Sequence, residues 1–208
     1  MVLGYLHETP SQTAGPYVHI GLIPQQAGFS TFDNPFGHVL TTPETAGERI
    51  RIEGRVFDGL GQPCRDVLLE IWQANAAGRY NSPVDRQHDK PLDPHFRGWG
   101  RSGTDFTTGL YSFETVKPGP VAGRPGGRPM APHANIWLVS RGMNIGLSTR
   151  MYFPDEAALN ARDPVLGMLD PTIRRATLIA RREHRDGTPV YVFDIRLQGD
   201  RETVFFDV

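Results

Sequence analysis

The sequence has a single cysteine, Cys64, among its 208 residues, so no disulfide can form within the chain. Such scarcity is typical of a reducing compartment. The sequence has no excess of charge of either sign, because 22 basic and 23 acidic residues leave a net charge of −1. Nucleic-acid-binding proteins, in contrast, usually carry an excess of basic residues. Neither a membrane-spanning apolar run nor a signal-peptide pattern is present. We therefore expect a soluble cytoplasmic protein that binds neither nucleic acid nor membranes.

Turn-forming residues, by contrast, are abundant, with 23 glycines and 18 prolines. Residues 49–57 alternate charged and apolar side chains, the period-two pattern of a half-buried strand. The Asp186-Gly187 pair between two alternating runs is a strong hairpin signal. Further strands are expected at residues 66–73, 110–116, 134–140, 145–153, 177–182 and 190–197, and short helices at 154–160 and 163–166.

This pattern predicts a mainly β fold: a single-domain β-sandwich with long loops and short peripheral helices. One core can serve a chain of this length, and we find neither a repeat nor a flexible linker, so residues 1–208 are expected to form one domain. Residues 1–48 show little periodicity and are expected to be a mostly extended or loop arm. Residues 81–98 are expected to be a long loop rich in Pro, Asp and His.

Four segments agree in order and spacing with one enzyme family. They are Thr9 to Tyr17, Glu70-Ile71-Trp72-Gln73-Ala74-Asn75, Gly109 to Pro120, and Ala131 to Gly142. With them, the sequence resembles the intradiol ring-cleaving dioxygenases over nearly its whole length. The joint match is far more specific than any one motif, and it implies the β-sandwich fold of that family.

The resemblance also implies that this chain lacks the iron ligands of the family. The family holds ferric iron with two tyrosinates and two histidines, and the matching positions here are Gln87, Val121, Asn135 and Trp137. We therefore expect no metal site and no catalytic residue in this chain, with Trp137 filling the space of the metal as part of a packed core. His133 lies on the same strand face as Asn135, but one imidazole without a tyrosinate makes a poor ferric site.

Within the family, the resemblance is to the non-catalytic α chain of the two-chain members. It implies a homologous β chain that carries Fe(III), a higher αβ oligomer, and cleavage of protocatechuate with O2 between its hydroxylated carbons to 3-carboxy-cis,cis-muconate. The 1–48 arm is then expected to pack on the partner chain. This chain would shape the pocket and the assembly and would be inactive alone.

The resemblance places five residues of this chain at the substrate pocket: Thr13, Gly15, Pro16, Tyr17 and Arg141. A guanidinium can bind a substrate carboxylate through paired N–H donors. Gly15 and Pro16 make a rigid turn that lets the backbone approach closely. In the alternative, Arg141 forms only a structural ion pair and residues 13–17 only seal an interface.

Two further alternatives stay open. One is a self-sufficient iron dioxygenase with shifted ligands, for which His88 and His95, with Asp89 and Asp93 between them, offer a weak candidate set. The other is a β-sandwich binding or structural module without a dioxygenase role, because fold does not fix function. Nucleophile-elbow, P-loop and dinucleotide-binding motifs are absent.

Overall fold

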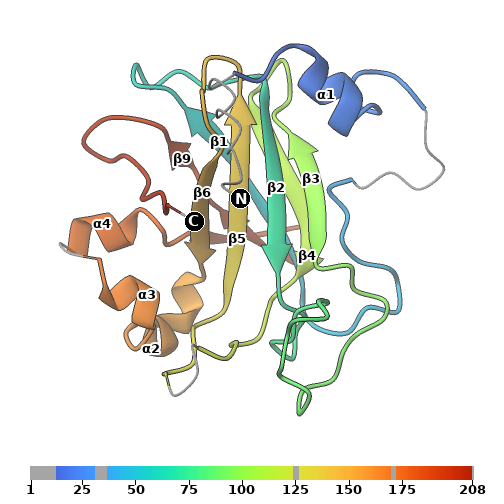
Figure 1. Ribbon diagram of the computed structural model, residues 1–208, viewed down its shortest axis with the longest axis vertical. Helices are drawn as coiled ribbons and strands as arrows, with labels where there is room; N and C mark the ends of the chain where they lie inside the picture. Colours follow the sequence, from blue (N-terminus) through green and yellow to red (C-terminus); the bar gives the residue numbers. More distant parts are fainter. Residues whose placement is uncertain (1–12, 31–36, 124–126, 170–171, 208) are drawn as a thin grey trace, which may run out of the picture.

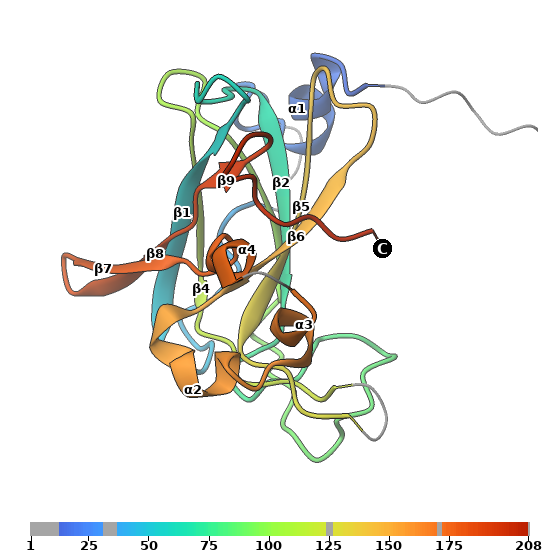
Figure 2. The same cartoon turned by 90° about the vertical axis from the view of Figure 1, so that its left-hand side faces the viewer.

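The computed structural model describes residues 13–30, 37–123, 127–169 and 172–207, and it folds as two β-sheets packed face to face (Figures 1 and 2). The first sheet has the order β4-β1-β8-β7, with β9 also pairing with β1, and the second has the order β3-β2-β5-β6. The strands are β1 (Arg49–Phe57), β2 (Val67–Gln73), β3 (Trp99–Gly103), β4 (Leu110–Val116), β5 (His133–Ser140), β6 (Leu147–Tyr152), β7 (Arg181–Arg185), β8 (Thr188–Val192) and β9 (Ile195–Arg196). The predicted β-sandwich is therefore confirmed.

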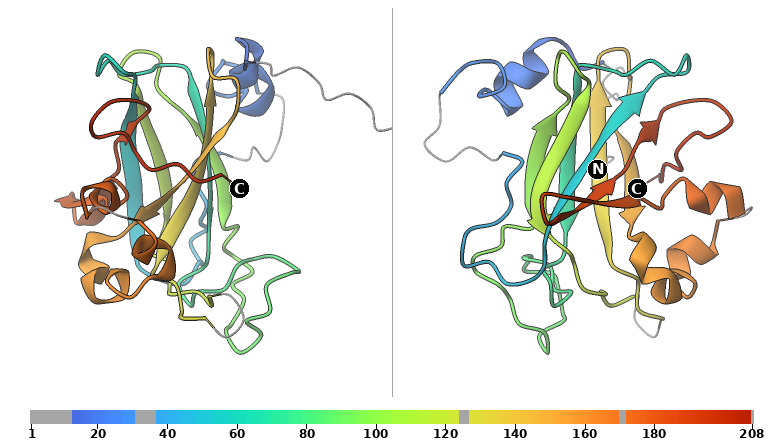
Figure 3. Two further views of the ribbon diagram at one scale, coloured as in Figure 1. Left: turned by 60° about the vertical axis from the view of Figure 1, so that its left-hand side comes forward. Right: turned by 180° about the vertical axis from the view of Figure 1, so that it is seen from behind.

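Short helices lie outside the sandwich. Helix α1 is at one end of the molecule, opposite the end that carries α2 and α3 (Figures 1 and 3). The helical elements are α1 (Tyr17–Leu22), the 3-10 turn η1 (Pro154–Glu156), α2 (Ala157–Asn160), α3 (Pro164–Gly167) and α4 (Thr172–Ala176). Asp163 caps α3 by accepting the N–H groups of Val165 and Leu166, and Pro164 takes the first helical position, as expected for a helix N-terminus. Among the helices of the described residues, none is long and apolar enough to cross a membrane.

The core lies between the two sheets, where the inward face of each strand is apolar. In β1 and β5 the alternation of period two decides which residues enter it: Ile50 and Ile52 from one sheet meet Ile136 and Leu138 from the other. Burial of each such side chain stabilises the fold by about 1.5–3 kcal/mol. Packing against the first sheet therefore holds β5 rigidly, and the side chains on the outer face of β5 have fixed positions.

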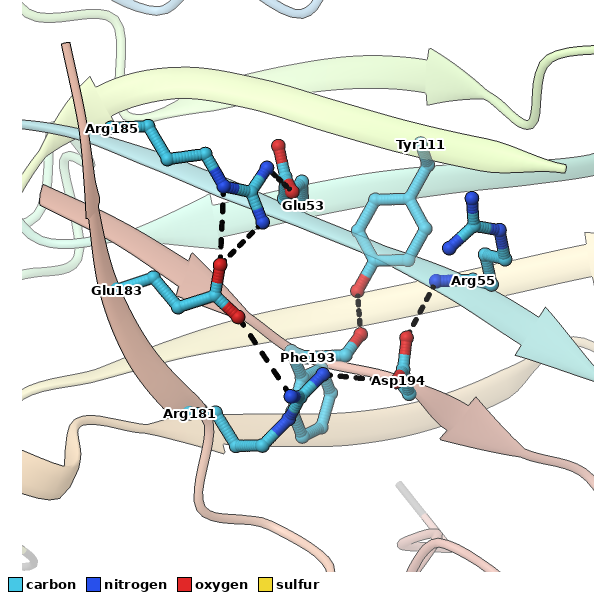
Figure 4. Close-up of polar contacts among 8 residues, drawn as sticks. All are labelled: Glu53, Arg55, Tyr111, Arg181, Glu183, Arg185, Phe193 and Asp194. Carbon is cyan, nitrogen blue, oxygen red and sulfur yellow. Dashed lines mark hydrogen bonds and ion pairs between the residues drawn. The ribbon is translucent and has the colours of Figure 1, made fainter. Parts of the chain in front are cut away.

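The outer side of the first sheet carries a ladder of charges that ties the β7–β8 hairpin to β1 (Figure 4). Arg185 pairs with Glu53, which is almost fully buried, and also with Glu183. Arg181 continues the ladder from Glu183 to Asp194. These contacts pin an otherwise exposed edge strand, and the charges on β7 also oppose pairing with another chain at that edge.

The structure differs from the sequence prediction at four elements. Strand β3 and helix α4 were not predicted, and helix α1 forms where residues 1–48 were expected to be loop. The predicted hairpin turn at Asp186-Gly187 is confirmed, but its first strand is β7 (Arg181–Arg185), not residues 177–182. The start of the arm, residues 1–12, lies outside the described residues, and its packing on a partner stays a prediction.

Candidate functional site

The outward face of the second sheet presents two rows of side chains that run across all four strands. The strand register places residues of neighbouring strands directly opposite one another, and such residues share a face of the sheet. The first row is Trp99, Trp72, Asn135 and Arg150, and the second is Arg101, Glu70, Trp137 and Ser148. Asn135 and Trp137, the counterparts of the histidine pair, therefore stand on this outer face, in its middle.

Trp137 is not part of the packed core, so that expectation was wrong. Its side chain is 37% exposed, whereas its neighbours Ile136 and Leu138 are buried. Because successive side chains on a strand point to opposite faces, the apolar residues of β5 fix Asn135 and Trp137 on the outside. The indole lies across Gly146: a Cβ added to that glycine would come within 2.2 Å of Trp137 Nε1.

Asn135 belongs to a hydrogen-bond network in which the donor and the acceptor of each bond can be assigned. Arg150 Nε donates to Asn135 Oδ1 at 2.9 Å, and Asn135 Nδ2 donates to the Tyr80 hydroxyl oxygen at 3.2 Å. His133 Nδ1 lies 2.7 Å from Ala131 O, and since a carbonyl only accepts, Nδ1 carries the proton. His133 Nε2 therefore accepts from the Tyr80 hydroxyl, at 3.3 Å.

The other two iron-ligand counterparts, Gln87 and Val121, connect to the same neighbourhood. Gln87 Oε1 accepts from the backbone N–H of Ala122 and from Lys90 Nζ, both at 2.7 Å. Val121 is buried and bridges to Met130, whose sulfur lies 3.4 Å from Nη1 of Arg150. A chain of contacts thus runs from Gln87 through the Val121-Ala122 backbone, Met130 and Arg150 to Asn135.

These residues do not fit ferric iron. The amides Gln87 and Asn135 and the apolar Val121 offer none of the anionic ligands that the metal prefers. The Tyr80 hydroxyl is committed to two hydrogen bonds, and burial raises its pKa, so it stays a neutral phenol. Burial, with the Arg150 charge adding to it, lowers the pKa of His133 to about 4, but both ring nitrogens already have partners.

The cation at this centre is instead the Arg150 guanidinium, which no motif in the sequence singled out. Tyr80 was missed as well, although it comes only five residues after Asn75 in the Trp-Gln-Ala segment. The weaker metal candidates also fail: the Asp93 carboxylate accepts the backbone N–H groups of Ala46 and His95, and Nδ1 of His88 lies near Arg79. In the part of the chain that the structure describes, no group of three or more His, Cys, Asp or Glu could hold a metal ion.

The five residues expected at a substrate pocket gather at the opposite end of β5, where α1 begins. Gly15, Pro16 and Arg141 line one hollow with a volume of about 440 Å³. The Thr13 hydroxyl accepts the backbone N–H of Gly142 at 2.6 Å, which ties the N-terminal segment to the turn after β5. Tyr17 opens helix α1 with its side chain 78% exposed.

Arg141 has a partner within the chain. Its Nε donates to the carboxylate of Asp66, and the pair is open to solvent, with the Arg141 side chain 62% exposed. An exposed pair of this kind contributes only about 0–1 kcal/mol to stability. His19, which sequence reasoning missed, also lines this hollow, and burial lowers the pKa of its imidazole.

The Asn135 centre and the hollow at Arg141 lie far apart. Arg141 directly follows β5 and is six residues beyond Asn135, which corresponds to about 20 Å at ~3.3 Å per residue. A small substrate held by Arg141 therefore cannot reach the Asn135 centre of the same chain. Whatever Thr13, Gly15, Pro16, Tyr17 and Arg141 serve lies beyond this chain's own counterpart of the iron site.

The two-sheet fold, with its centre on the outer face of β2, β5 and β6, is the fold of solved dioxygenase structures. A dioxygenase domain from Streptomyces sp. SirexAA-E aligns with a TM-score of 0.56, covering 95% of this chain and 100% of that chain at 23% identity. Hydroxyquinol 1,2-dioxygenase from Pseudomonas putida DLL-E4 aligns with a TM-score of 0.58, covering 81% and 64% of the two chains at 18% identity. At these identities the likeness shows the fold.

Sequence comparison goes further. The family model described as Dioxygenase matches residues 36–199. The chain is 49% identical over 207 residues to a protocatechuate 3,4-dioxygenase alpha chain from Pseudomonas putida, covering 100% of both. It is also 42% identical over 184 residues to the beta chain of that enzyme from Burkholderia cepacia, covering 79% of this chain and 73% of the other. The chain belongs to the intradiol ring-cleaving dioxygenase family, an iron-enzyme family, and is not an unrelated β-sandwich module.

Proposed function

We propose that this chain is the non-iron-binding α subunit of a protocatechuate 3,4-dioxygenase, in which a homologous β chain carries Fe(III). The observation that carries the proposal is the replacement of all four ligand positions in a chain that matches a curated alpha chain from end to end. The enzyme would open protocatechuate with O2 between its hydroxylated carbons, giving 3-carboxy-cis,cis-muconate. That chemistry is assigned to the partner's iron and uses no side chain of this subunit. A cytoplasmic location goes with this proposal.

The role of this chain is then to shape the partner's substrate pocket and to hold the assembly together. Thr13, Gly15, Pro16, Tyr17 and Arg141 support this role because they gather at one end of β5, far from the chain's own Asn135 centre. Arg141 would bind the carboxylate of protocatechuate, and the backbone at Gly15 would approach the substrate closely. A Cβ added at Gly15 meets nothing within 4 Å in this chain, so the fold itself does not require glycine there.

The pocket role of Arg141 is tested by Arg141→Ala in the assembled enzyme. A hydrogen bond to a charged group contributes about 1.5–3 kcal/mol, so we expect KM for protocatechuate to rise roughly 10- to 100-fold, with iron content unchanged. Stability should change by less than about 1 kcal/mol, because the ion pair with Asp66 is exposed.

The matched control is Asp66→Asn, which removes the same ion pair but keeps the guanidinium. If Arg141 binds substrate, this variant leaves KM within about threefold of the wild type. An equal rise in KM for both variants would assign Arg141 a structural role only, and an unchanged kcat/KM in Arg141→Ala would remove it from the pocket.

The location of the iron is tested with the full chain produced without its partner. Tyrosinate-to-iron charge transfer colours an intradiol centre red-brown, so the purified chain should be colourless, contain no iron by metal analysis and lack ring-cleaving activity. Co-production with the β chain should restore colour and activity together. A coloured, active chain on its own would instead establish the self-sufficient dioxygenase with shifted ligands.

A further inference from the structure

The outer face of the second sheet is hollowed where the two rows of side chains meet. This hollow has a volume of about 380 Å³, within the range of about 300–1,000 Å³ that is usual for small-molecule sites. Four aromatic side chains and one arginine contribute to its lining. The lining residues that matter are Trp72, Trp99, Trp137, Asn135, Arg150 and Phe206.

Arg150 enters this hollow with its charge unpaired by the described acids. It donates to Asn135 Oδ1 and to the sulfur of Met130, and it also interacts with the Tyr152 hydroxyl; all three groups are neutral. Among the ion pairs of the described residues, none involves Arg150, although the chain holds a half-buried guanidinium here. A charge that has lost part of its hydration without an ionic partner favours binding of an anion.

The guanidinium is also held in a fixed orientation. Its Nε is bonded to Asn135, whose amide nitrogen is held in turn by Trp72 O at 3.2 Å and by the Tyr80 hydroxyl. The bonds to Asn135 and Met130 engage Nε and one N–H of Nη1 and leave other N–H donors of the guanidinium for a ligand. A planar guanidinium with a fixed orientation suits an acceptor with two oxygens, such as a carboxylate.

The aromatic walls are fixed by contacts of their own. Trp72 stacks on Tyr80, with ring centroids 5.6 Å apart and an angle of 17° between the planes. Trp137 lies across Gly146, which leaves its indole no room on that side. Of the acids at the rim, Glu70 is paired with Arg101 at 2.6 Å, and Asp207 is exposed, where solvent screens its charge.

We propose that this hollow binds a small planar aromatic carboxylate without any metal. The carboxylate is held by Arg150 and the ring lies against Trp72 and Trp137. The site is thus a binding site in the place where a catalytic relative has its reaction centre. The proposal rests on the contacts around Arg150 and does not depend on the partner chain or on the pocket role of Arg141.

Calorimetric titration of the full chain with benzoate tests the proposal, with acetate as the non-aromatic probe. We expect saturable binding of one benzoate per chain, at least tenfold tighter than acetate. Arg150→Met should weaken benzoate binding tenfold or more. The matched control, Arg196→Met, replaces an arginine that lies over Phe57 on the other sheet and should leave the affinity unchanged.

A second variant keeps the proposal testable if Arg150→Met misfolds. Trp137→Ala alters an exposed side chain and keeps the Asn135–Arg150 bond, so it should weaken benzoate binding several-fold and leave acetate binding unaffected. In an αβ assembly, Arg150→Met should remove one benzoate per pair, while benzoate still perturbs the visible absorption of the partner's iron. Absence of saturable binding, equal affinity for acetate, or full affinity in Arg150→Met would each overturn the proposal.

Discussion

Gly54 in β1 lies against the backbone of residues 193–194, which join β8 to β9 beside β1 in the same sheet. A Cβ at this position would lie 2.0 Å from the carbonyl oxygen of Phe193 and 3.1 Å from the hydroxyl of Tyr111 (Figure 4 shows both neighbours). Ordinary contact between carbon and oxygen needs more than 3 Å, and the obstacle is main chain, which cannot rotate away. Gly54→Ala must therefore push residues 193–194 away from β1.

The cost of that displacement follows from the contacts it breaks. The Phe193 N–H donates to Glu53 O at 2.8 Å, and the Arg55 N–H donates to Asp194 Oδ1 at 3.1 Å. Loss of two such bonds costs about 1–3 kcal/mol in all, and overpacking adds about 1–3 kcal/mol. We expect Gly54→Ala to lower the free energy of unfolding by roughly 3–5 kcal/mol, which lowers Tm by about 6–15 °C in a chain of this size.

Chemical and thermal unfolding followed by circular dichroism, at one protein concentration, measures the effect. Gly15→Ala is the matched control, because nothing lies within 4 Å of its added Cβ, and its Tm should stay within about 2 °C of the wild type. A Gly54→Ala variant as stable as Gly15→Ala would refute the close approach of Phe193 to β1.

Three further predictions concern single side chains. Tyr111→Phe should lower the free energy of unfolding by about 1–2 kcal/mol in urea without changing the m-value, because the Phe193 carbonyl loses its buried donor; an unchanged midpoint would contradict that bond. His133 stays neutral when buried, with its pKa near 4 against 6.5 in the unfolded chain, so protonation favours unfolding and stability falls as the pH drops from 6.5 towards 4. Between pH 7 and pH 5 this group should account for a loss of about 2 kcal/mol, seen as a steeper pH dependence in the wild type than in His133→Gln, and equal slopes would argue against it. Gly146→Ala should displace the Trp137 indole, weakening benzoate binding with little change in Tm, and full affinity would show that Trp137 is not a wall of the site.

The sequence pattern predicted most strands because the alternation of apolar residues follows directly from burial of one face of each strand. The hairpin at Asp186-Gly187 also follows from local chemistry: Asp186 and Gly187 both take positive φ, as a tight turn requires. Strand β3 was missed for the opposite reason. Its Gly100 and Gly103 break the pattern, and they are needed because Leu40 and Gln26, distant in sequence, lie against them.

The orientation of Trp137 could have been read from the sequence. Ala134, Ile136 and Leu138 alternate with Asn135 and Trp137, so one set had to face away from the core. The error came from weighing the size of the indole above the period of the strand. Arg150 and Tyr80 could not have been found in this way, since their places beside Asn135 depend on strand register and on a loop that crosses the sheet edge.

If this chain is the non-iron-binding subunit that we propose, its polar centre on the outer face of β5 needs no metal. A guanidinium supplied by the neighbouring strand β6 provides the positive charge there. Asn135 keeps the acceptor that the cation needs, and the amide is in turn satisfied by Tyr80. Because the polar groups of Asn135, Tyr80 and His133 have partners in this chain of bonds, the centre avoids much of the cost of unpaired polar groups. Under the same proposal, the outer face of β5 positions Arg150, and the opposite end of the strand serves the partner chain.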